Sequence, residues 1–105
     1  MNILFVCSRN KWRSLTAETI YKNHSHHQIK SAGTAKSARI KINFKLINWA
    51  EIIFVMEKTH QTRLRALFPN EIKEKQLIVL GIKDEYQYMD HQLIALINEK
   101  VLPYL

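Results

Sequence analysis

The chain has 105 residues, of which 47% are hydrophobic and 24% are charged. This length fits a single domain spanning residues 1–105, and no apolar run approaches the ~20 residues that a bilayer crossing needs. We therefore expect a soluble, cytoplasmic protein. The single cysteine, Cys7, excludes an internal disulfide and a zinc site built from several thiolates. The only two glycines, Gly33 and Gly81, exclude a Walker A loop and a dinucleotide-binding fingerprint.

The formal net charge of +7 is unevenly distributed along the chain. Residues 1–50 contain nine basic residues and one acid, Glu18, which gives +8. Residues 51–105 contain seven basic and eight acidic residues, which gives −1. This asymmetry indicates that the first half faces an anion. Nucleic acid, a membrane surface and a phosphorylated substrate all satisfy that condition, and composition alone does not choose among them.

The first half of the chain predicts two strands and two helices. In order, we expect a buried strand over 2–6, a helix over 12–21, a weaker strand over 28–32, a basic irregular segment over 35–41 and a short helix over 42–49. The side chains expected to face inward are Leu15, Thr16, Thr19 and Ile20 in the first helix, and Leu46, Ile47 and Trp49 in the second.

The second half continues the alternation of strand and helix. We expect a strand over 51–56, a helix over 57–68 that ends at Pro69, a strand over 76–80 and an amphipathic helix over 90–101. Regular alternation predicts an α/β fold with a four-stranded parallel sheet, in the order 2-1-3-4, and helices on both faces. Ligands of such sheets bind beyond the carboxyl ends of the strands.

The segment that follows the first strand has the spacing Cys-x5-Arg-Ser, from Cys7 to Arg13 and Ser14. A tight turn from strand to helix directs backbone N–H groups toward an anion, and the helix N-terminus adds its positive end. Arg13 can bind two phosphate oxygens, and Ser14 can donate a hydrogen bond to the Cys7 thiolate. A thiolate beside a bound phosphate monoester is a nucleophile. The alternative, that Cys7 is only a small buried hydrophobe, leaves Arg13 and Ser14 unexplained.

Several segments resemble the low-molecular-weight protein tyrosine phosphatase family, and in particular a compact bacterial branch of predicted tyrosine phosphatases. The Cys7 loop is the specific part of the resemblance. The supporting segments, in chain order, are Ile3–Cys7 with Asn10, Thr16–Glu18, Ser31–Thr34, Ile53–Glu57 with Leu64, and Lys83–Tyr86.

The resemblance implies hydrolysis of a phosphomonoester, with phosphotyrosine as the expected substrate. Cys7 would form a cysteinyl-phosphate, and Asp84 would protonate the leaving oxygen. Arg13 would hold the phosphoryl oxygens, Asn10 would brace the loop, and neither a metal nor a cofactor is required. The phosphate-binding residues implied are Ser8, Arg9, Asn10, Lys11, Trp12 and Ser14, and Tyr86 is a candidate pocket wall. The implied partner is a phosphorylated protein or a small phosphomonoester.

This chain departs from the family pattern at several positions. Arg9 replaces a glycine, which predicts either strain at a positive φ, on the order of 1 kcal/mol, or a different loop geometry. Trp12 replaces a second cysteine, which excludes thiol pairing within the loop and disfavours arsenate reduction. Glu85 replaces the proline after the acid, which would leave Asp84 less rigidly aimed. The segment between Thr34 and Ile42 has no predicted helix.

Other residues carry open alternatives. Asp84 and Glu85 fit a solvated acidic loop as well as an acid, and Tyr86 and Tyr88 fit a core edge as well as a pocket wall. A metal cluster at His24, His26 and His27 is disfavoured because no carboxylate or thiol is nearby in the sequence. We expect His60 to be a surface or capping residue and Met56 to lie in the core. The basic set Lys30, Lys36, Arg39, Lys41 and Lys45 fits a solvated face or an extension of the positive field.

Three classes of function therefore remain. The first is a phosphatase, and the second is a module that recognises phosphate without catalysis, which the changes at Arg9 and Glu85 favour. The third, a nucleic-acid binder, ranks last because aromatic residues are not interleaved with the basic ones. No membrane partner is expected.

Overall fold

The four apolar segments form one parallel sheet in the order β2-β1-β3-β4, as predicted. A computed structural model describes all residues, 1–105. The strands are β1 (Asn2–Cys7), β2 (Gln28–Gly33), β3 (Ile52–Val55) and β4 (Gln76–Val79). The two central strands, β1 and β3, are almost wholly buried, which explains why their sequences are continuous apolar runs rather than alternating ones.

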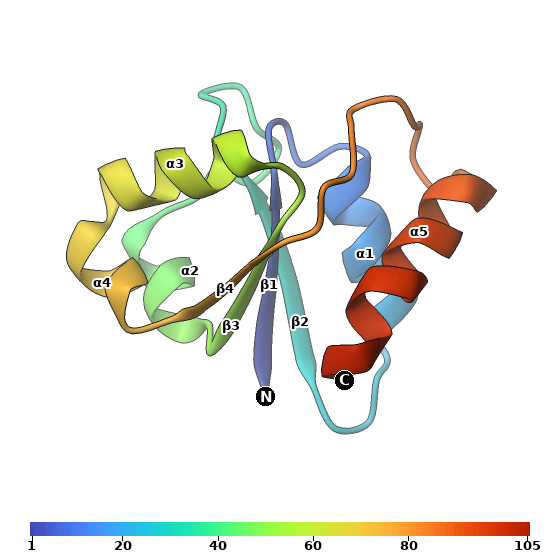
Figure 1. Ribbon diagram of the computed structural model, residues 1–105, viewed down its shortest axis with the longest axis horizontal. Coiled ribbons are helices and arrows are strands. Elements are labelled where there is room, and N and C mark those ends of the chain that lie inside the picture. The colour runs from blue at the N-terminus through green and yellow to red at the C-terminus, as the bar shows by residue number, and fades with distance from the viewer.

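Five α-helices cover the two faces of this sheet. They are α1 (Arg13–Tyr21), α2 (Phe44–Trp49), α3 (Lys58–Leu67), α4 (Pro69–Lys73) and α5 (His91–Val101), and a short 3-10 turn, Leu102–Tyr104, follows α5. Figure 1 shows α1 and α5 on one face and α2, α3 and α4 on the other. None of these helices has both the length and the apolar character that a bilayer crossing requires.

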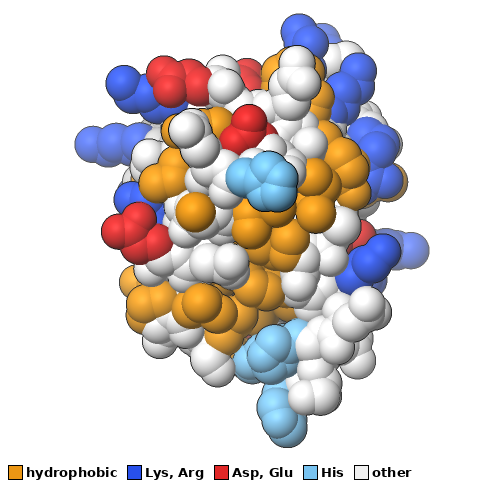
Figure 2. Space-filling model, turned by 90° about the vertical axis from the view of Figure 1, so that its right-hand side faces the viewer, with side chains coloured by type: hydrophobic (Ala, Val, Ile, Leu, Met, Phe, Trp, Pro, Cys, Tyr) orange, Lys and Arg blue, Asp and Glu red, His pale blue; other side chains and the backbone are white.

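The core has two layers because neighbouring residues of a strand point to opposite faces of the sheet. Ile3 and Phe5 of β1 pack with α1 and α5, whereas Leu4 and Val6 pack against α2, α3 and α4. Met56 lies in the first layer, as expected. On the outer side of α5, Figure 2 shows hydrophobic side chains in the middle of the face, histidine side chains in the middle and at the lower edge, and Lys and Arg mostly along the upper and lateral margins.

The buried faces of two helices differ from the prediction. In α1 the buried residues are Arg13, Ser14, Thr16, Ala17 and Tyr21, whereas Leu15, Thr19 and Ile20 are only half-buried. The first turn of α1 lies under the loop that precedes it, so polar residues take buried positions there. In α2 only Ile47 is buried, and Leu46 and Trp49 are half-buried.

Two helix boundaries also differ from the prediction. The N–H of Ile42 donates to Gly33 O (2.9 Å), so α2 begins two residues later, after Asn43 caps it by accepting from Leu46 N–H (2.9 Å). Pro69 follows α3 as predicted, but it also begins α4, which the prediction missed. Proline suits the first helical turn because its missing N–H has no partner there in any helix.

The end of β2 lies directly beneath the loop that follows β1. A Cβ at Gly33 would clash with the backbone carbonyl oxygen of Ser8 and would lie 2.7 Å from Ala38 Cβ. Only a glycine therefore allows the two loops to approach this closely. Gly81 is different, because it has a φ of +70° and open space around it.

We predict that Gly33→Ala lowers the free energy of unfolding by about 1–3 kcal/mol, the usual cost of overpacking. Urea denaturation measures this, and the amide NMR signals of residues 7–13 should move. The matched control, Gly81→Ala, should cost about 1 kcal/mol through backbone strain alone and should leave those signals in place. A Gly33→Ala variant with wild-type stability and unshifted signals would contradict the account.

Candidate active site

The Cys7 loop, residues 7–13, connects β1 to α1 and is bound from behind by the segment that follows β2. Four consecutive carbonyl oxygens of the loop accept hydrogen bonds from that segment. The contacts are Thr34 N–H to Cys7 O (2.9 Å), Ala35 N–H to Ser8 O (2.9 Å), Arg39 N–H to Arg9 O (2.9 Å) and Arg39 Nε–H to Asn10 O (3.3 Å). These bonds hold the carbonyl side of the loop against the protein.

The N–H groups of the same loop are left for a ligand. Asn10 N–H donates to Cys7 Sγ (3.2 Å). The N–H groups of Ser8, Arg9, Lys11, Trp12 and Arg13 donate to no protein acceptor. Successive unpaired N–H groups at a helix N-terminus form an anion site, because their dipoles all favour negative charge.

The left-handed residue of the loop is Asn10, with a φ of 59°, and not Arg9. The strain expected from an arginine at the family's glycine position therefore does not arise. Asparagine adopts this conformation more readily than other non-glycine residues. One of the two alternatives at Arg9 was a positive φ, whereas the structure places the positive φ one residue later, at Asn10.

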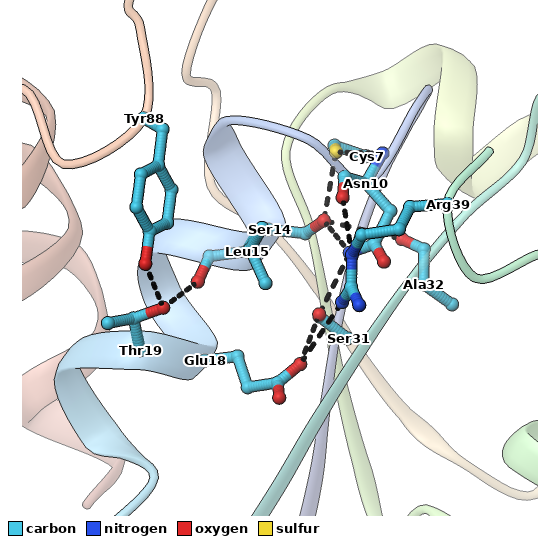
Figure 3. A network of polar contacts seen from close by, with 10 residues as sticks. All are labelled: Cys7, Asn10, Ser14, Leu15, Glu18, Thr19, Ser31, Ala32, Arg39 and Tyr88. Carbon is cyan, nitrogen blue, oxygen red and sulfur yellow. Dashed lines mark hydrogen bonds and ion pairs between the residues drawn. The ribbon is translucent and has the colours of Figure 1, made fainter.

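Cys7 Sγ lies at the end of a chain of hydrogen bonds whose direction is fixed as far as Ser14 (Figure 3). Glu18 only accepts, so Ser31 Oγ–H donates to its Oε1. Asn10 Nδ2 then donates to Ser31 Oγ and to Ser14 Oγ, both at 2.8 Å. Ser14 Oγ lies 2.9 Å from Cys7 Sγ and 3.4 Å from Ala32 O. When Cys7 is a thiolate, its sulfur can only accept, so the Ser14 Oγ–H then donates to it.

Arg13 is 2% exposed and its guanidinium is held by the ends of two other strands. Nη1 donates to Glu57 Oε1 (2.5 Å), just after β3, and to Ile82 O (2.8 Å), after β4. Nη2 contacts no protein acceptor, and Nε lies 3.8 Å from Asp84 Oδ1. The buried charge is thus compensated by Glu57, while one edge of the guanidinium stays free for a ligand.

These groups surround a pocket of about 100 Å³, well below the range for drug-sized ligands. It is lined by Cys7, Ser8, Arg9, Lys11, Trp12, Arg13 and Asp84. Seven of the predicted site residues thus lie together. Asn10 and Ser14 are wholly buried and do not line the pocket. They lie behind it, in hydrogen-bond contact with Cys7 Sγ. A pocket of this size fits a phosphoryl group rather than a whole substrate.

The tyrosines predicted as a pocket wall lie elsewhere. Tyr86 is half-buried against the hydrophobic core, and Tyr88 is exposed, with its hydroxyl 2.9 Å from Thr19 Oγ1. Both follow Asp84 in a loop that continues toward α1 and α5. Tyr86 packs at the edge of the core, whereas Tyr88 does not. The rings of His24 and His27 lie 4.6 Å apart, but no group of three His, Cys, Asp or Glu side chains is arranged to hold a metal ion.

His60 is the residue that the sequence placed least well. It caps α3, as expected, because its Nδ1 accepts Glu57 N–H (3.0 Å). It is not a surface residue, since it is 3% exposed, and its Nε2 lies 2.9 Å from Ser8 Oγ. Burial, helped by the charge of Arg13, lowers the pKa of His60 to about 4.

The prediction also gave no role to Glu57, Glu18 or Ser31. Glu57 had a usable signal, because it directly follows the strand predicted over 51–56 and the carboxyl ends of parallel strands meet at one edge of the sheet. Glu18 and Ser31 had none, since their contact depends on how α1 packs against β2.

Comparison with solved structures identifies the fold. SP-PTP, a low molecular weight protein tyrosine phosphatase from Streptococcus pyogenes, superposes with a TM-score of 0.81 at 16% identity, covering 99% of this chain and 90% of that chain. Wzb from Vibrio vulnificus, solved in complex with benzylphosphonate, gives 0.78 at 21% identity, covering 98% and 95%. The YwlE arginine phosphatase from Geobacillus stearothermophilus gives 0.69 at 18% identity, covering 98% and 94%. No protein-family model and no curated protein matches the chain.

The chain therefore has the fold of the low-molecular-weight protein tyrosine phosphatases. This confirms the predicted architecture, and at the level of the fold it confirms the resemblance seen in the sequence. The structural neighbours include proteins that are described as tyrosine phosphatases and as arginine phosphatases.

The hydrogen bond from Ser14 predicts a test of the sulfur's environment. Ser14→Ala removes the Oγ–H donor and should disfavour the thiolate. We expect alkylation of Cys7 by iodoacetamide near neutral pH to slow by about tenfold, the effect of one hydrogen bond to a charged group. Thr19→Ala, which removes a hydroxyl from the same helix away from the sulfur, is the control. An unchanged alkylation rate in Ser14→Ala would show that Ser14 does not stabilise the thiolate.

Proposed function

We propose that the protein hydrolyses phosphomonoesters, with phosphotyrosine as the preferred class, through a cysteinyl-phosphate on Cys7. One observation carries the proposal: Cys7 Sγ, unpaired loop N–H groups and the free edge of Arg13 share a pocket of phosphoryl size. Membership of the low-molecular-weight phosphatase family is part of the same proposal, which the fold supports.

In the first step the Cys7 thiolate attacks phosphorus and an S–P bond forms. The P–O bond to the leaving group breaks, and its electron pair stays on the departing oxygen. Asp84, at the pocket, gives that oxygen a proton. Proton transfer matters most for a phenol that leaves poorly as an anion.

In the second step water attacks phosphorus and passes its proton to the Asp84 carboxylate. The S–P bond breaks, its electron pair returns to Cys7, and inorganic phosphate leaves. Ser14 assists here because its hydroxyl stabilises the departing thiolate. During both steps the loop N–H groups and Arg13 hold the equatorial oxygens, whose charge rises in the transition state.

The rim of the pocket supports an aryl ester as substrate. Trp12 is 42% exposed and lines the pocket, so its ring can pack against the ring of a phosphotyrosine. Arg9 and Lys11 line the same pocket and disfavour phosphoarginine, whose guanidinium becomes cationic when the phosphoryl group leaves.

The second candidate is phosphate recognition without turnover. One observation favours it: Asp84 is 56% exposed in its side chain, and its only polar contact is the 3.8 Å ion pair with Arg13. Nothing else holds the carboxylate, and Glu85 stands where the family has a proline.

We predict that Cys7→Ser abolishes hydrolysis of an aryl phosphate but preserves phosphate binding, because the cradle is mostly backbone. Asp84→Asn should slow hydrolysis by about 10²–10⁴-fold, the usual contribution of a general acid. The loss should shrink for substrates with more acidic leaving groups. The rates of wild type and variants on a series of substituted aryl phosphates measure this.

Two matched controls accompany the test. Glu85→Gln removes the neighbouring charge, and Asp90→Asn keeps a capping residue at the start of α5. Neither should affect the rate by more than a few-fold. A large loss in either, with none in Asp84→Asn, would mean that the acid is misassigned. A wild type that binds phosphate but hydrolyses no activated aryl phosphate would establish the recognition module instead.

We also predict that Trp12→Ala raises KM for aryl phosphates by about 2- to 10-fold, the range for an aromatic contact. KM for an alkyl phosphate such as glycerol phosphate should hardly change. Trp12→Phe, which keeps a ring, should behave like wild type toward both substrates. Equal effects of Trp12→Ala on aryl and alkyl substrates would rule out a role in ring recognition.

A further inference from the structure

His60 joins the Cys7 loop to the N-terminus of α3 through both nitrogens of its ring. Nδ1 accepts the backbone N–H of Glu57 (3.0 Å), and Nε2 lies 2.9 Å from Ser8 Oγ. The ring is 3% exposed, so water cannot replace either partner easily.

These two contacts fix the tautomer of His60. A backbone N–H can only donate, so Nδ1 must carry a lone pair. The neutral ring then carries its proton on Nε2, and that N–H donates to Ser8 Oγ. The direction of the hydrogen bond between His60 and Ser8 is thus set by a backbone group on the far side of the ring.

The ring stays neutral across the physiological range. Burial and the positive charge of Arg13 lower the pKa of His60 to about 4, although the acids Glu57 and Asp84, which also face the ring, act in the opposite direction. Near neutral pH the Nδ1 atom of His60 therefore remains an acceptor and its Nε2–H remains a donor. Only below about pH 4 does a proton on Nδ1 compete with the N–H of Glu57.

Ser8 consequently has a free proton. Its hydroxyl accepts from His60, no protein group accepts its own hydrogen, and Ser8 lines the pocket. We propose that His60 is a positioning residue that turns the Ser8 hydroxyl into a dedicated hydrogen-bond donor for the bound phosphoryl group. The proposal rests on the proposed function, since the acceptor is the phosphoryl group of the substrate.

One short turn would then position two of the side-chain donors that line the pocket, Arg13 and Ser8. Glu57 holds Arg13 through its carboxylate, and its backbone N–H holds His60, which holds Ser8. The turn between β3 and α3 therefore contributes to phosphate binding without touching the ligand.

Four variants separate this role from the capping role of His60. Ser8→Ala removes the hydroxyl, and Ser8→Thr keeps it. His60→Asn keeps a short amide near the position of Nδ1 but is too short to reach Ser8, whereas His60→Gln is long enough to present an amide N–H to Ser8. A purely structural role of His60 would not make the effects of Ser8 and His60 variants depend on each other.

The test is the affinity of wild type and variants for inorganic phosphate near neutral pH, measured by amide NMR titration. We expect Ser8→Ala and His60→Asn each to weaken binding by about 10- to 100-fold, the range for a hydrogen bond to a charged group. The double variant Ser8→Ala/His60→Asn should be no weaker than either single one. Ser8→Thr and His60→Gln should bind nearly as wild type, and ring nitrogen spectra should show the Nε2–H tautomer.

Each contrary result has its own meaning. If wild type binds phosphate and Ser8→Ala binds it equally well, the proposal is wrong. It is also wrong if the losses from Ser8→Ala and His60→Asn add, because the two residues then act separately. If wild type itself binds no phosphate, the proposed function fails first. If His60→Asn does not fold, His60→Gln and the two Ser8 variants decide the question. A tenfold weaker affinity of His60→Gln for phosphate, together with wild-type affinity of Ser8→Ala, overturns the proposal.

Discussion

The backbone carbonyls of the Cys7 loop are held from behind, and the site depends on this constraint. Because four consecutive oxygens accept hydrogen bonds from the segment after β2, the N–H groups of the loop turn toward the pocket. Gly33 permits the approach, since a larger residue would clash with the Ser8 carbonyl. Because β1 and β2 are parallel neighbours, their carboxyl ends lie side by side, and the segment after β2 can bind the loop after β1. The anion cradle therefore depends on the topology of the sheet.

Two carboxylates that lie outside the pocket, those of Glu18 and Glu57, hold the side chains of the site in place. Glu18 fixes the direction of the hydrogen bonds that run through Ser31 and Asn10 to Ser14, the residue beside Cys7 Sγ. Glu57 compensates the buried charge of Arg13, which would otherwise cost several kcal/mol. Neither acid contacts the reacting atoms, yet each determines what a neighbouring group presents to them.

Much of this could be predicted from the sequence, for physical reasons that differ from residue to residue. The apolar strands and the Cys-x5-Arg-Ser spacing are local signals, so the sheet order and the pairing of Cys7 with Arg13 followed from them. The place of Asp84 at the same pocket was expected only from the resemblance to the family. For Tyr86 the sequence left two alternatives open, because residue types do not define the path of a loop; the structure packs it against the core. The capping role of His60 was predicted, but its burial was not, because that burial includes a contact with Ser8, 52 residues away in the chain. Of the two alternatives at Arg9, strain or a different loop geometry, strain does not apply because Asn10 takes the left-handed conformation.

The central claim is that Cys7 becomes covalently phosphorylated. Acid quenching of the protein during steady-state hydrolysis of an aryl phosphate, followed by mass spectrometry of the peptide that contains Cys7, tests it directly. The account predicts a peptide heavier by one phosphoryl group, with the modification on Cys7 and absent from Cys7→Ser. Asp84→Asn also slows hydrolysis of the intermediate, so the modified peptide should remain detectable in that variant. Turnover that proceeds with no phosphoryl group on Cys7 under any quench condition would contradict the account.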